Sequence, residues 1–330
     1  MTRPACFLTW IEHRRTRSLC EQLGIELAEI VTARRGLARY AELIPRTLAW
    51  LWRCRPSVLL VQSPSMVLAA LTVLLRPLIG YRLVFDAHNE AVQPYVHPSA
   101  SVVALARWLM RKADHVIVTN PGLATTVTQC GGKPVILPDP LPEPPAVTPR
   151  PLPGDFRVAV ISTFAPDEPF EAVIAAARRI GEDVRLYVTG NPDKLSPETR
   201  AAMPGNMTLT GFLSEPDYWS LLASCDAVMD LTTMENCLVC GAYEAIAVGR
   251  PVLLSDNAAS VATFAGFGEF TSNEPEAIAA ALQRLRARCA DLTAELPARR
   301  REFLQRWQAQ AQVLRNIIEA RPATSAASAD

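Results

Sequence analysis

The chain has 330 residues, about twice the length that one hydrophobic core usually supports, so the sequence predicts two domains. Its 33 basic and 33 acidic side chains balance, which argues against nucleic acid as a partner. The first fifteen residues contain no apolar stretch of signal-peptide length, so we expect a cytoplasmic protein.

Six short apolar runs, separated mostly by helix-length segments, fill the first part of the chain. Runs of this kind are typical of parallel strands that are buried on both faces, and they lie at 5–11, 26–32, 57–63, 82–88, 115–120 and 134–139. The most apolar region, 58–85, is interrupted by polar residues and prolines, so it predicts strand, helix and strand rather than a membrane span. Contact of an exposed apolar helix with a membrane surface stays open.

The same pattern restarts after a proline-rich segment, 138–155, which predicts a stiff linker. The second set of strand-like runs lies at 156–163, 184–190, 207–212, 227–232 and 251–256. We therefore predict an α/β protein of two doubly wound, Rossmann-like domains, 1–145 and 146–298, facing each other across a cleft. A helix at 299–320 is expected to pack back on the first domain, and 321–330 to form a disordered tail.

One carboxylate stands out in the second domain. Glu244 lies in a small, apolar run that a core-facing helix would use, and buried carboxylates need a partner. Gly241 comes just before it, and a helix start beside a glycine offers backbone N–H groups to a phosphate. A carboxylate one turn later can accept hydrogen bonds from ribose hydroxyls, which together suits a nucleoside diphosphate. The alternative is a core helix with an incidental glutamate.

The segment from Glu244 to Val252 resembles the nucleotide-sugar signature of GT-B glycosyltransferases of the GT4-like group. The resemblance implies a GT-B fold, a nucleotide-sugar donor and a ribose-binding role for Glu244. It places Asn236, with Glu235 beside it, where the family has a carboxylate that contacts the donor sugar. By the same resemblance the turn before the helix binds the donor, through Cys237, Leu238, Val239, Cys240 and Gly241.

The chain departs from this family where the diphosphate binds. Ser162 and Thr163 stand in place of a Gly-Arg pair, and Asp167-Glu168-Pro169 lies near the position of a lysine. This pattern resembles a divergent subgroup found among capsule and exopolysaccharide glycosyltransferases. Hydroxyls and helix dipoles supply only fractional positive charge, so we expect full charge to come from elsewhere.

Basic residues that follow the first strand are candidates for that charge. His13, Arg14 and Arg15 are expected to bind the diphosphate, or an anionic acceptor, when the domains close. The alternative is a solvated first helical turn.

The end of the run at 82–88 carries the candidate catalytic residues. By the family resemblance His88 contacts the donor sugar, and Asp86 or Glu90 is the candidate general base of an inverting reaction. Asp86 could instead cap a turn.

Two further loops are expected to reach the donor. Gly190 and Asn191 follow a strand at the position where the base or phosphate is contacted in such folds, and Phe212 or Leu213 can pack against the base.

The eight cysteines are expected to be reduced, and Cys237 and Cys240 to be packing thiols. Zinc or redox chemistry is the alternative for this CxxC, but no second pair or nearby histidine accompanies it. No DxD motif marks a metal site, so a divalent ion is not expected to be required.

These features predict a glycosyltransferase that moves a sugar from a nucleotide-sugar donor to a glycan or lipid-linked acceptor in polysaccharide or glycoconjugate synthesis. We expect no tightly bound cofactor and a cytoplasmic location that includes the inner face of the plasma membrane. The alternatives are a GT-B nucleotide-sugar epimerase and a non-catalytic module that binds nucleotide sugars.

Overall fold

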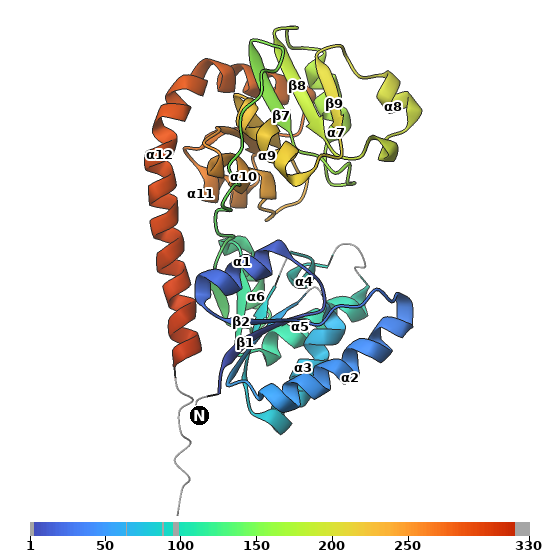
Figure 1. The fold of residues 1–330 in the computed structure, drawn as a ribbon, viewed down its shortest axis with the longest axis vertical. Helices are drawn as coiled ribbons and strands as arrows, with labels where there is room; N and C mark the ends of the chain where they lie inside the picture. Colours follow the sequence, from blue (N-terminus) through green and yellow to red (C-terminus); the bar gives the residue numbers. More distant parts are fainter. Residues whose placement is uncertain (1–2, 64, 88, 95–98, 321–330) are drawn as a thin grey trace, which may run out of the picture. The chain divides into compact units, whose positions relative to one another are not determined.

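The computed structural model describes residues 3–63, 65–87, 89–94 and 99–320. The chain divides into two compact units: unit 1 consists of Met1–Asp139 and Arg306–Asp330, and unit 2 is Pro140–Gln305. Each unit is built on one six-stranded sheet, so the predicted α/β architecture of two doubly wound domains is confirmed (Figure 1). The boundary after Asp139 lies a few residues before the expected one.

Unit 1 contains one strand for every apolar run predicted in that part of the chain. The strands are β1 (Ala5–Thr9), β2 (Glu26–Glu29), β3 (Val58–Gln62), β4 (Arg82–Asp86), β5 (His115–Val118) and β6 (Pro134–Ile136). They are parallel and lie in the order β2-β1-β3-β4-β5-β6. The helices between them are α1 (Arg14–Leu23), α2 (Gly36–Cys54), α3 (Met66–Ile79), α4 (Asn89–Val92), α5 (Ala100–Lys112) and α6 (Pro121–Gln129).

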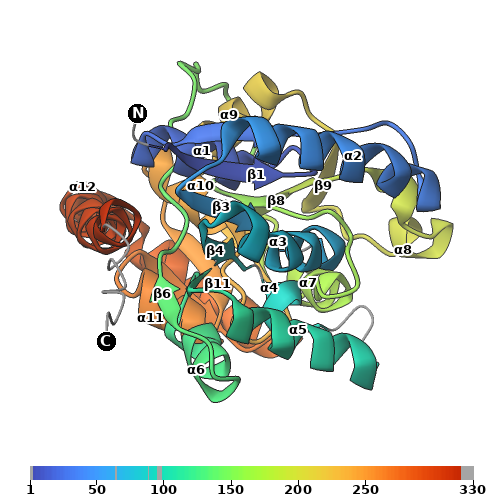
Figure 2. The ribbon, with the colours of Figure 1, turned by 90° about the horizontal axis from the view of Figure 1, so that it is seen from below.

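The two faces of this sheet are covered by different helices, because successive side chains of a strand point to opposite sides. Leu59 and Val61 of β3 face a core that includes residues of α2, α3, α5 and α6. Leu60 faces the other core, with residues of α1 and the last part of the C-terminal helix. Figure 2 shows α3 and α5 on one side of the strands and α12 on the other. No described helix is long and apolar enough to cross a membrane, and 58–86 forms strand, helix and strand as predicted.

Unit 2 has the strand order β12-β11-β10-β7-β8-β9, again all parallel. The strands are β7 (Phe156–Val160), β8 (Val184–Thr189), β9 (Met207–Gly211), β10 (Ala227–Asp230), β11 (Val252–Ser255) and β12 (Gly268–Thr271). The helical segments are α7 (Phe170–Ala177), η1 (Pro192–Lys194), α8 (Pro197–Ala201), α9 (Glu215–Ser224), α10 (Cys240–Ala247), α11 (Ala258–Phe264) and α12 (Pro275–Glu319). The sequence did not predict β12, whose Glu269 forms ion pairs with Arg284 and Arg288 of α12.

The C-terminal helix α12 is longer than predicted. It begins at Pro275 rather than at residue 299 and continues through Pro297. A proline inside a helix bends it without always ending it, and Figure 1 shows α12 curving along its length. Its residues up to Gln305 belong to unit 2, whereas those from Arg306 belong to unit 1.

The proline-rich segment after Asp139, which the sequence predicts to be a stiff linker, packs against unit 2. Leu141, Val147 and Leu152 belong to or pack against the core of unit 2. The Tyr187 hydroxyl donates a hydrogen bond of 2.7 Å to the carbonyl oxygen of Pro153. Prolines keep this segment extended, and its leucine and valine side chains attach it to the domain surface.

Candidate functional site

A pocket of about 470 Å³ lies in unit 2, where the loops after β7, β8 and β9 meet. In parallel sheets ligands bind outside the carboxyl ends of the strands, near the point where strand order reverses, and in this sheet that point lies between β7 and β10. The lining unites six predicted donor-binding residues: Ser162, Thr163, Gly190, Asn191, Phe212 and Leu213. Their roles toward a donor stay predictions.

The floor of this pocket requires glycine at position 190. Gly190 has a φ of 107°, and a Cβ added there would lie 2.5 Å from the carbonyl oxygen of Ser162. At the rim, the Phe212 side chain is 88% exposed. An exposed aromatic ring beside a polar floor is a suitable surface on which a nucleobase can stack.

The structure adds two residues to the pocket that the sequence did not single out, Lys194 and Tyr218. The ammonium group of Lys194, in η1, donates a hydrogen bond of 2.8 Å to the carbonyl oxygen of Thr163. Unit 2 therefore has a full positive charge in its own pocket, which revises the expectation that this charge must come from elsewhere. No sequence pattern marks this lysine, because a lysine in a polar loop that lines a pocket cannot be distinguished by sequence from one that faces solvent.

Glu244 is tolerated on α10 because Tyr218 is its partner. The Tyr218 hydroxyl donates a hydrogen bond of 2.5 Å to Oε2 of the half-buried Glu244. Burial, reinforced by the Glu244 carboxylate, holds the pKa of Tyr218 far above its usual range, so Tyr218 stays a donor. Since Tyr218 lines the pocket, Glu244 lies directly behind the lining.

The start of α10 is occupied from within the protein. The backbone N–H of Gly241 donates a hydrogen bond of 2.9 Å to the Asp230 carboxylate. Gly241 is buried, and a Cβ there would lie 2.3 Å from Ile161 and 2.5 Å from Asp230. The expectation that this N–H faces a phosphate is therefore wrong in the observed state: glycine is needed here for close packing. Burial raises the pKa of Asp230 to about 8.

The turn before α10 packs mainly against the domain. Leu238 and Val239 contact the hydrophobic core, and the carbonyl oxygen of Cys237 accepts hydrogen bonds from Asn257 and Ser260. Asn236 has a φ of 57°, a left-handed conformation that asparagine tolerates well. Glu235 is exposed. The donor contacts of this turn, Cys240 included, stay predictions.

The cysteines and acidic residues do not form a recognisable metal site in the part of the chain that the structure describes. All eight cysteines, among them Cys237 and Cys240, are outside disulfides. Within the described ranges no group of three or more histidine, cysteine, aspartate or glutamate side chains is arranged to hold a metal ion.

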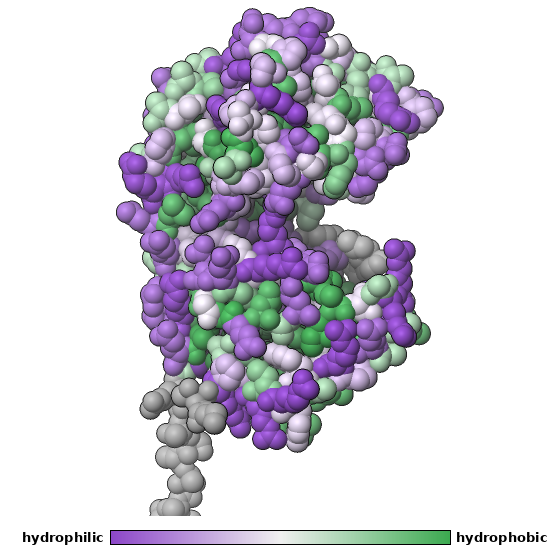
Figure 3. Space-filling view, viewed as in Figure 1, coloured by the Kyte–Doolittle hydropathy of each residue, from purple (hydrophilic) through white to green (hydrophobic). Residues whose placement is uncertain are grey.

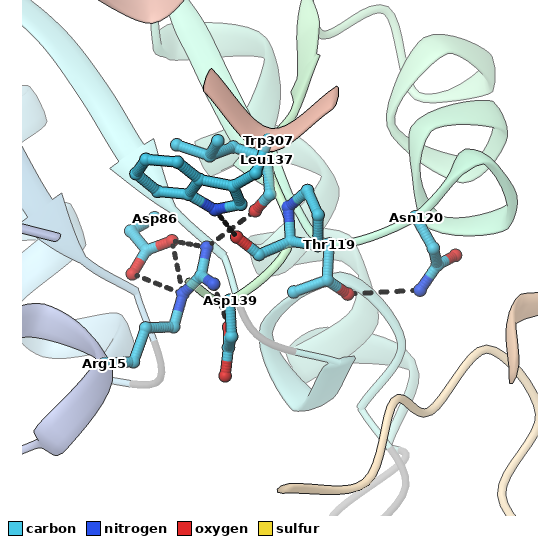
Figure 4. Close-up of polar contacts among 8 residues, drawn as sticks. Arg15, Asp86, Thr119, Asn120, Leu137, Asp139 and Trp307 are labelled. Carbon is cyan, nitrogen blue, oxygen red and sulfur yellow. Dashed lines mark hydrogen bonds and ion pairs between the residues drawn. The ribbon is translucent and has the colours of Figure 1, made fainter. Parts of the chain in front are cut away.

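In unit 1, Arg15 is bound by the protein itself, as Figure 4 shows. Its buried guanidinium donates to Asp86 at 3.1 Å, to the carbonyl oxygen of Leu137 at 3.0 Å and to Asp139. Arg15 is therefore not a solvent-facing ligand for a diphosphate, and that expectation is corrected. Asp86 is 1% exposed, and both of its carboxylate oxygens accept hydrogen bonds from Arg15.

The other candidates of unit 1 differ in their surroundings. His13 is half-buried, and burial lowers its pKa, so it adds little positive charge at neutral pH. Arg14 is exposed, and its role toward a diphosphate stays a prediction. His88 lies outside the described residues. Glu90, in α4, lines a pocket of about 570 Å³.

This second pocket combines aromatic and polar side chains. The rings of Trp10 and Tyr40 lie 6.1 Å apart, and the Arg39 guanidinium lies 4.5 Å from the centre of the Tyr40 ring. Thr32, Ser65 and Glu90 supply further polar groups to the lining. Aromatic faces beside hydrogen-bonding groups suit a sugar or another amphipathic ligand.

Comparison with solved structures shows the fold. HepE of Anabaena in complex with UDP-glucose has a TM-score of 0.67 and 16% identity, with 93% of this chain and 91% of that chain covered. Sucrose-phosphate synthase of Thermosynechococcus elongatus has a TM-score of 0.67 and 18% identity, with 96% of this chain and 89% of that chain covered. The lipopolysaccharide outer core galactosyltransferase WaaB in its apo form has a TM-score of 0.67 and 12% identity, with 95% of this chain and 98% of that chain covered. At such identities the likeness shows a shared GT-B fold.

Family models identify both domains, although no curated protein matches the sequence significantly. The model of the glycosyl transferase 4-like domain matches residues 5–138, and that of glycosyl transferases group 1 matches residues 155–288. The first match covers most of unit 1, and the second covers most of unit 2. The chain therefore belongs to the GT-B glycosyltransferases that join a 4-like domain to a group 1 domain, and it is a glycosyltransferase.

Proposed function

We propose that the donor is a nucleoside diphosphate sugar that binds in the 470 Å³ pocket of unit 2. The observation that carries this proposal is the convergence of loops from three strands on one pocket with complementary chemistry. In this proposal Phe212 offers a surface for the base and Lys194 a charge for phosphate. Glu244, which accepts a hydrogen bond from Tyr218 of the lining, is proposed to bind the ribose hydroxyls. HepE has been solved with UDP-glucose, which supports UDP as the first nucleotide to test.

The acceptor in this proposal is a glycan or a lipid-linked sugar that binds in the 570 Å³ pocket of unit 1. The half-buried Tyr40 can stack against a sugar ring, as aromatic side chains commonly do at such sites, and Trp10, 6% exposed, packs beside it. Glu90 is a better candidate than Asp86 for the general base, because Glu90 lines the pocket whereas Asp86 is held by Arg15. WaaB, which has the same fold, is a lipopolysaccharide galactosyltransferase, in agreement with a glycan acceptor.

Helix α2 is the surface through which we propose contact with the inner face of an anionic membrane. Its buried side uses Leu43, Thr47 and Leu51. On its other side an exposed apolar stripe repeats at helical spacing: Leu37, Ala41, Pro45, Leu48 and Trp52. Residues 34–55 also hold six arginines and one glutamate, so this surface is basic although the chain is neutral overall.

The space-filling view supports this assignment. Figure 3 shows hydrophobic and hydrophilic side chains side by side on the face of unit 1 that carries α2 and α3. Trp52 is 60% exposed, and tryptophan is favoured at the interface between lipid and water. The location proposed for the protein is accordingly cytoplasmic, at the membrane surface.

A donor screen tests the proposed reaction and separates it from the alternatives. The protein is incubated with UDP-, GDP- and ADP-sugars and with glycan or lipid-linked acceptors, and products are identified by mass spectrometry. Transfer of the sugar supports the proposal. An epimerised nucleotide sugar without transfer would indicate an epimerase, and binding without any turnover would indicate a non-catalytic module. Activity that survives EDTA would support the proposed independence from divalent metals.

A further inference from the structure

The loop after β7 holds a carboxylate of its own chain in a set of convergent donors. Glu168 accepts hydrogen bonds from the Ser162 hydroxyl at 2.5 Å and the Thr163 hydroxyl at 2.7 Å. It also accepts from the backbone N–H of Thr163 at 3.0 Å and of Phe164 at 2.8 Å. We call these two hydroxyls and two amides the cradle. It presents four donors to one anion.

The backbone is shaped for this purpose. Phe164 has a φ of 55°, which is costly for a residue with a bulky side chain. A left-handed residue in this position turns successive N–H groups toward the same side, and such nests bind anions. The Phe164 ring is fixed against Phe170 at 4.9 Å and covers Gly190, so the conformation is enforced by packing.

The cradle belongs to the donor pocket rather than to the core. Ser162 and Thr163 line that pocket, and the Lys194 ammonium lies on the carbonyl oxygen of Thr163. Two of the residues that supply cradle donors thus line the pocket in which we propose that the donor binds, and Lys194 is bound to the same loop. Carboxylate and phosphate oxygens accept the same charge-assisted hydrogen bonds, so Glu168 occupies the cradle as an anionic ligand would.

We propose that the cradle binds a phosphate group of the donor, and that Glu168 fills it until the donor displaces the Glu168 side chain. This inference rests on the proposed nucleotide-sugar donor. The backbone of Glu168 is held independently, by its N–H to Ala165 and its carbonyl oxygen to the N–H of Phe170. Displacement therefore needs only rotation of the side chain. The loop itself stays in place.

Such a competitor makes the site selective. The apparent affinity of a ligand that uses the cradle is its intrinsic affinity multiplied by the fraction of protein in which the cradle is open. A nucleoside diphosphate gains the cradle when Glu168 leaves, whereas a nucleoside has no group to place there. Glu168 therefore penalises phosphate-bearing ligands in the wild type, and its removal should improve their binding selectively.

The test compares wild type with Glu168→Ala by calorimetry, using UDP, GDP and ADP and then the nucleoside of the one that binds best. We expect Glu168→Ala to bind the diphosphate at least about tenfold more tightly, while nucleoside affinity changes less than about twofold. Glu171→Ala is the matched control, since Glu171 is exposed on the first turn of α7 and outside the cradle. Its affinities should equal those of the wild type. Repeating the titrations at about 0.5 M NaCl screens the general effect of a lost charge, so a gain that persists comes from the cradle.

Amide hydrogen exchange gives a second readout on the same proteins. The N–H groups of Thr163 and Phe164 should be protected in the wild type with and without nucleotide. In Glu168→Ala they should lose protection and regain it with the diphosphate. If Glu168→Ala unfolds at a much lower temperature than the wild type, Glu168→Gln, which removes the charge but keeps the size of the side chain, replaces it in both experiments.

Equal or weaker diphosphate binding after removal of Glu168, or amides that stay exposed in its complex, would overturn the inference and leave the donor proposal intact. If no nucleotide binds to any of these proteins, the donor proposal fails, and the cradle inference fails with it.

Discussion

Arg15 and Asp86 form a buried ion pair that joins the first turn of α1 to the carboxyl end of β4. Both side chains are at most 3% exposed, and Asp139 and the carbonyl oxygen of Leu137 use further donors of the guanidinium. Burial alone would lower the pKa of Arg15, but Asp139 and Asp86 raise it far above its usual range. Arg15 therefore stays charged at neutral pH.

Removing Arg15 should destabilise unit 1, because it leaves Asp86 buried without its cation. We expect Arg15→Ala to lower the free energy of unfolding by about 3–5 kcal/mol, measured by urea denaturation. Arg14→Ala, at the exposed neighbouring position, should change it by less than about 0.5 kcal/mol. A stable Arg15→Ala variant that loses turnover would instead make Arg15 a substrate ligand.

Glu244 should matter for the ribose of the donor. Two hydrogen bonds to hydroxyls stabilise a complex by roughly 1.5–3 kcal/mol, so Glu244→Ala should weaken nucleotide binding about tenfold or more. The wild type should bind a 2′-deoxy nucleotide more weakly than the corresponding ribonucleotide. Glu244→Ala should bind the two nucleotides with equal affinity. Glu215→Ala on α9 is the control. If deletion of the 2′-hydroxyl costs the same affinity in both proteins, Glu244 does not contact it.

Asp230 should make the stability of the protein depend on pH. Its pKa is about 8 in the folded protein against 3.8 ordinarily, so between these values the folded state binds a proton that the unfolded state lacks. The free energy of unfolding should therefore fall as pH rises from about 4 to about 8, with a slope of at most about 1.36 kcal/mol per unit. Asp230→Asn, which can still accept from Gly241, should flatten this slope. Asp256→Asn, at an exposed position, should not.

Cys237 and Cys240 should not bind a metal ion that the activity requires. We expect the double serine variant to retain activity, with equal and substoichiometric zinc in both proteins by elemental analysis. Stoichiometric zinc that is lost together with activity in the double variant would contradict this prediction.

The apolar stripe of α2 should bind anionic vesicles. Burial of a large apolar side chain contributes about 1.5–3 kcal/mol, so Leu48→Ser with Trp52→Ser should reduce sedimentation with phosphatidylglycerol vesicles about tenfold or more. Vesicles of phosphatidylcholine alone should bind weakly, because they lack the charge that attracts the arginines. Val313→Ser, at an exposed position of α12, is the control. Undiminished binding by the α2 variant would exclude this surface.

Strand-rich parts of the fold were predictable because strands such as β3 are continuous apolar runs with every residue buried. The strand β12 was missed because its four residues include a glycine and Glu269, whose charge is satisfied only by residues of α12. The sequence analysis predicted only the last part of α12, whereas the helix begins at Pro275 and continues through Pro297.

The rule that loops after parallel strands carry function predicted the edge of the sheet at which the 470 Å³ pocket lies, and the resemblance to GT-B glycosyltransferases directed attention to Ser162, Gly190 and Phe212 there. The rule could not show that the N–H of Gly241 is already bound by Asp230. Arg15 could have been recognised as buried, since Leu19 lies four residues later on the same helical face. The position of Lys194 depends on a tertiary contact with Thr163, whereas the cradle around Glu168 depends on the backbone conformation of one loop, including the positive φ of Phe164.

The chain passes between the units twice, after Asp139 and after Gln305, and the Trp307 indole N–H donates a hydrogen bond of 3.0 Å to the carbonyl oxygen of Pro138 beside these crossings. Unit 2 is thus an uninterrupted insert in unit 1, and the flanks of the insert meet. An insert with adjacent ends can be exchanged without redirecting the host chain. Residues 140–305 therefore define an exchangeable segment. If unit 2 binds the donor as proposed, grafting the corresponding segment of a relative at these two joints should change donor specificity.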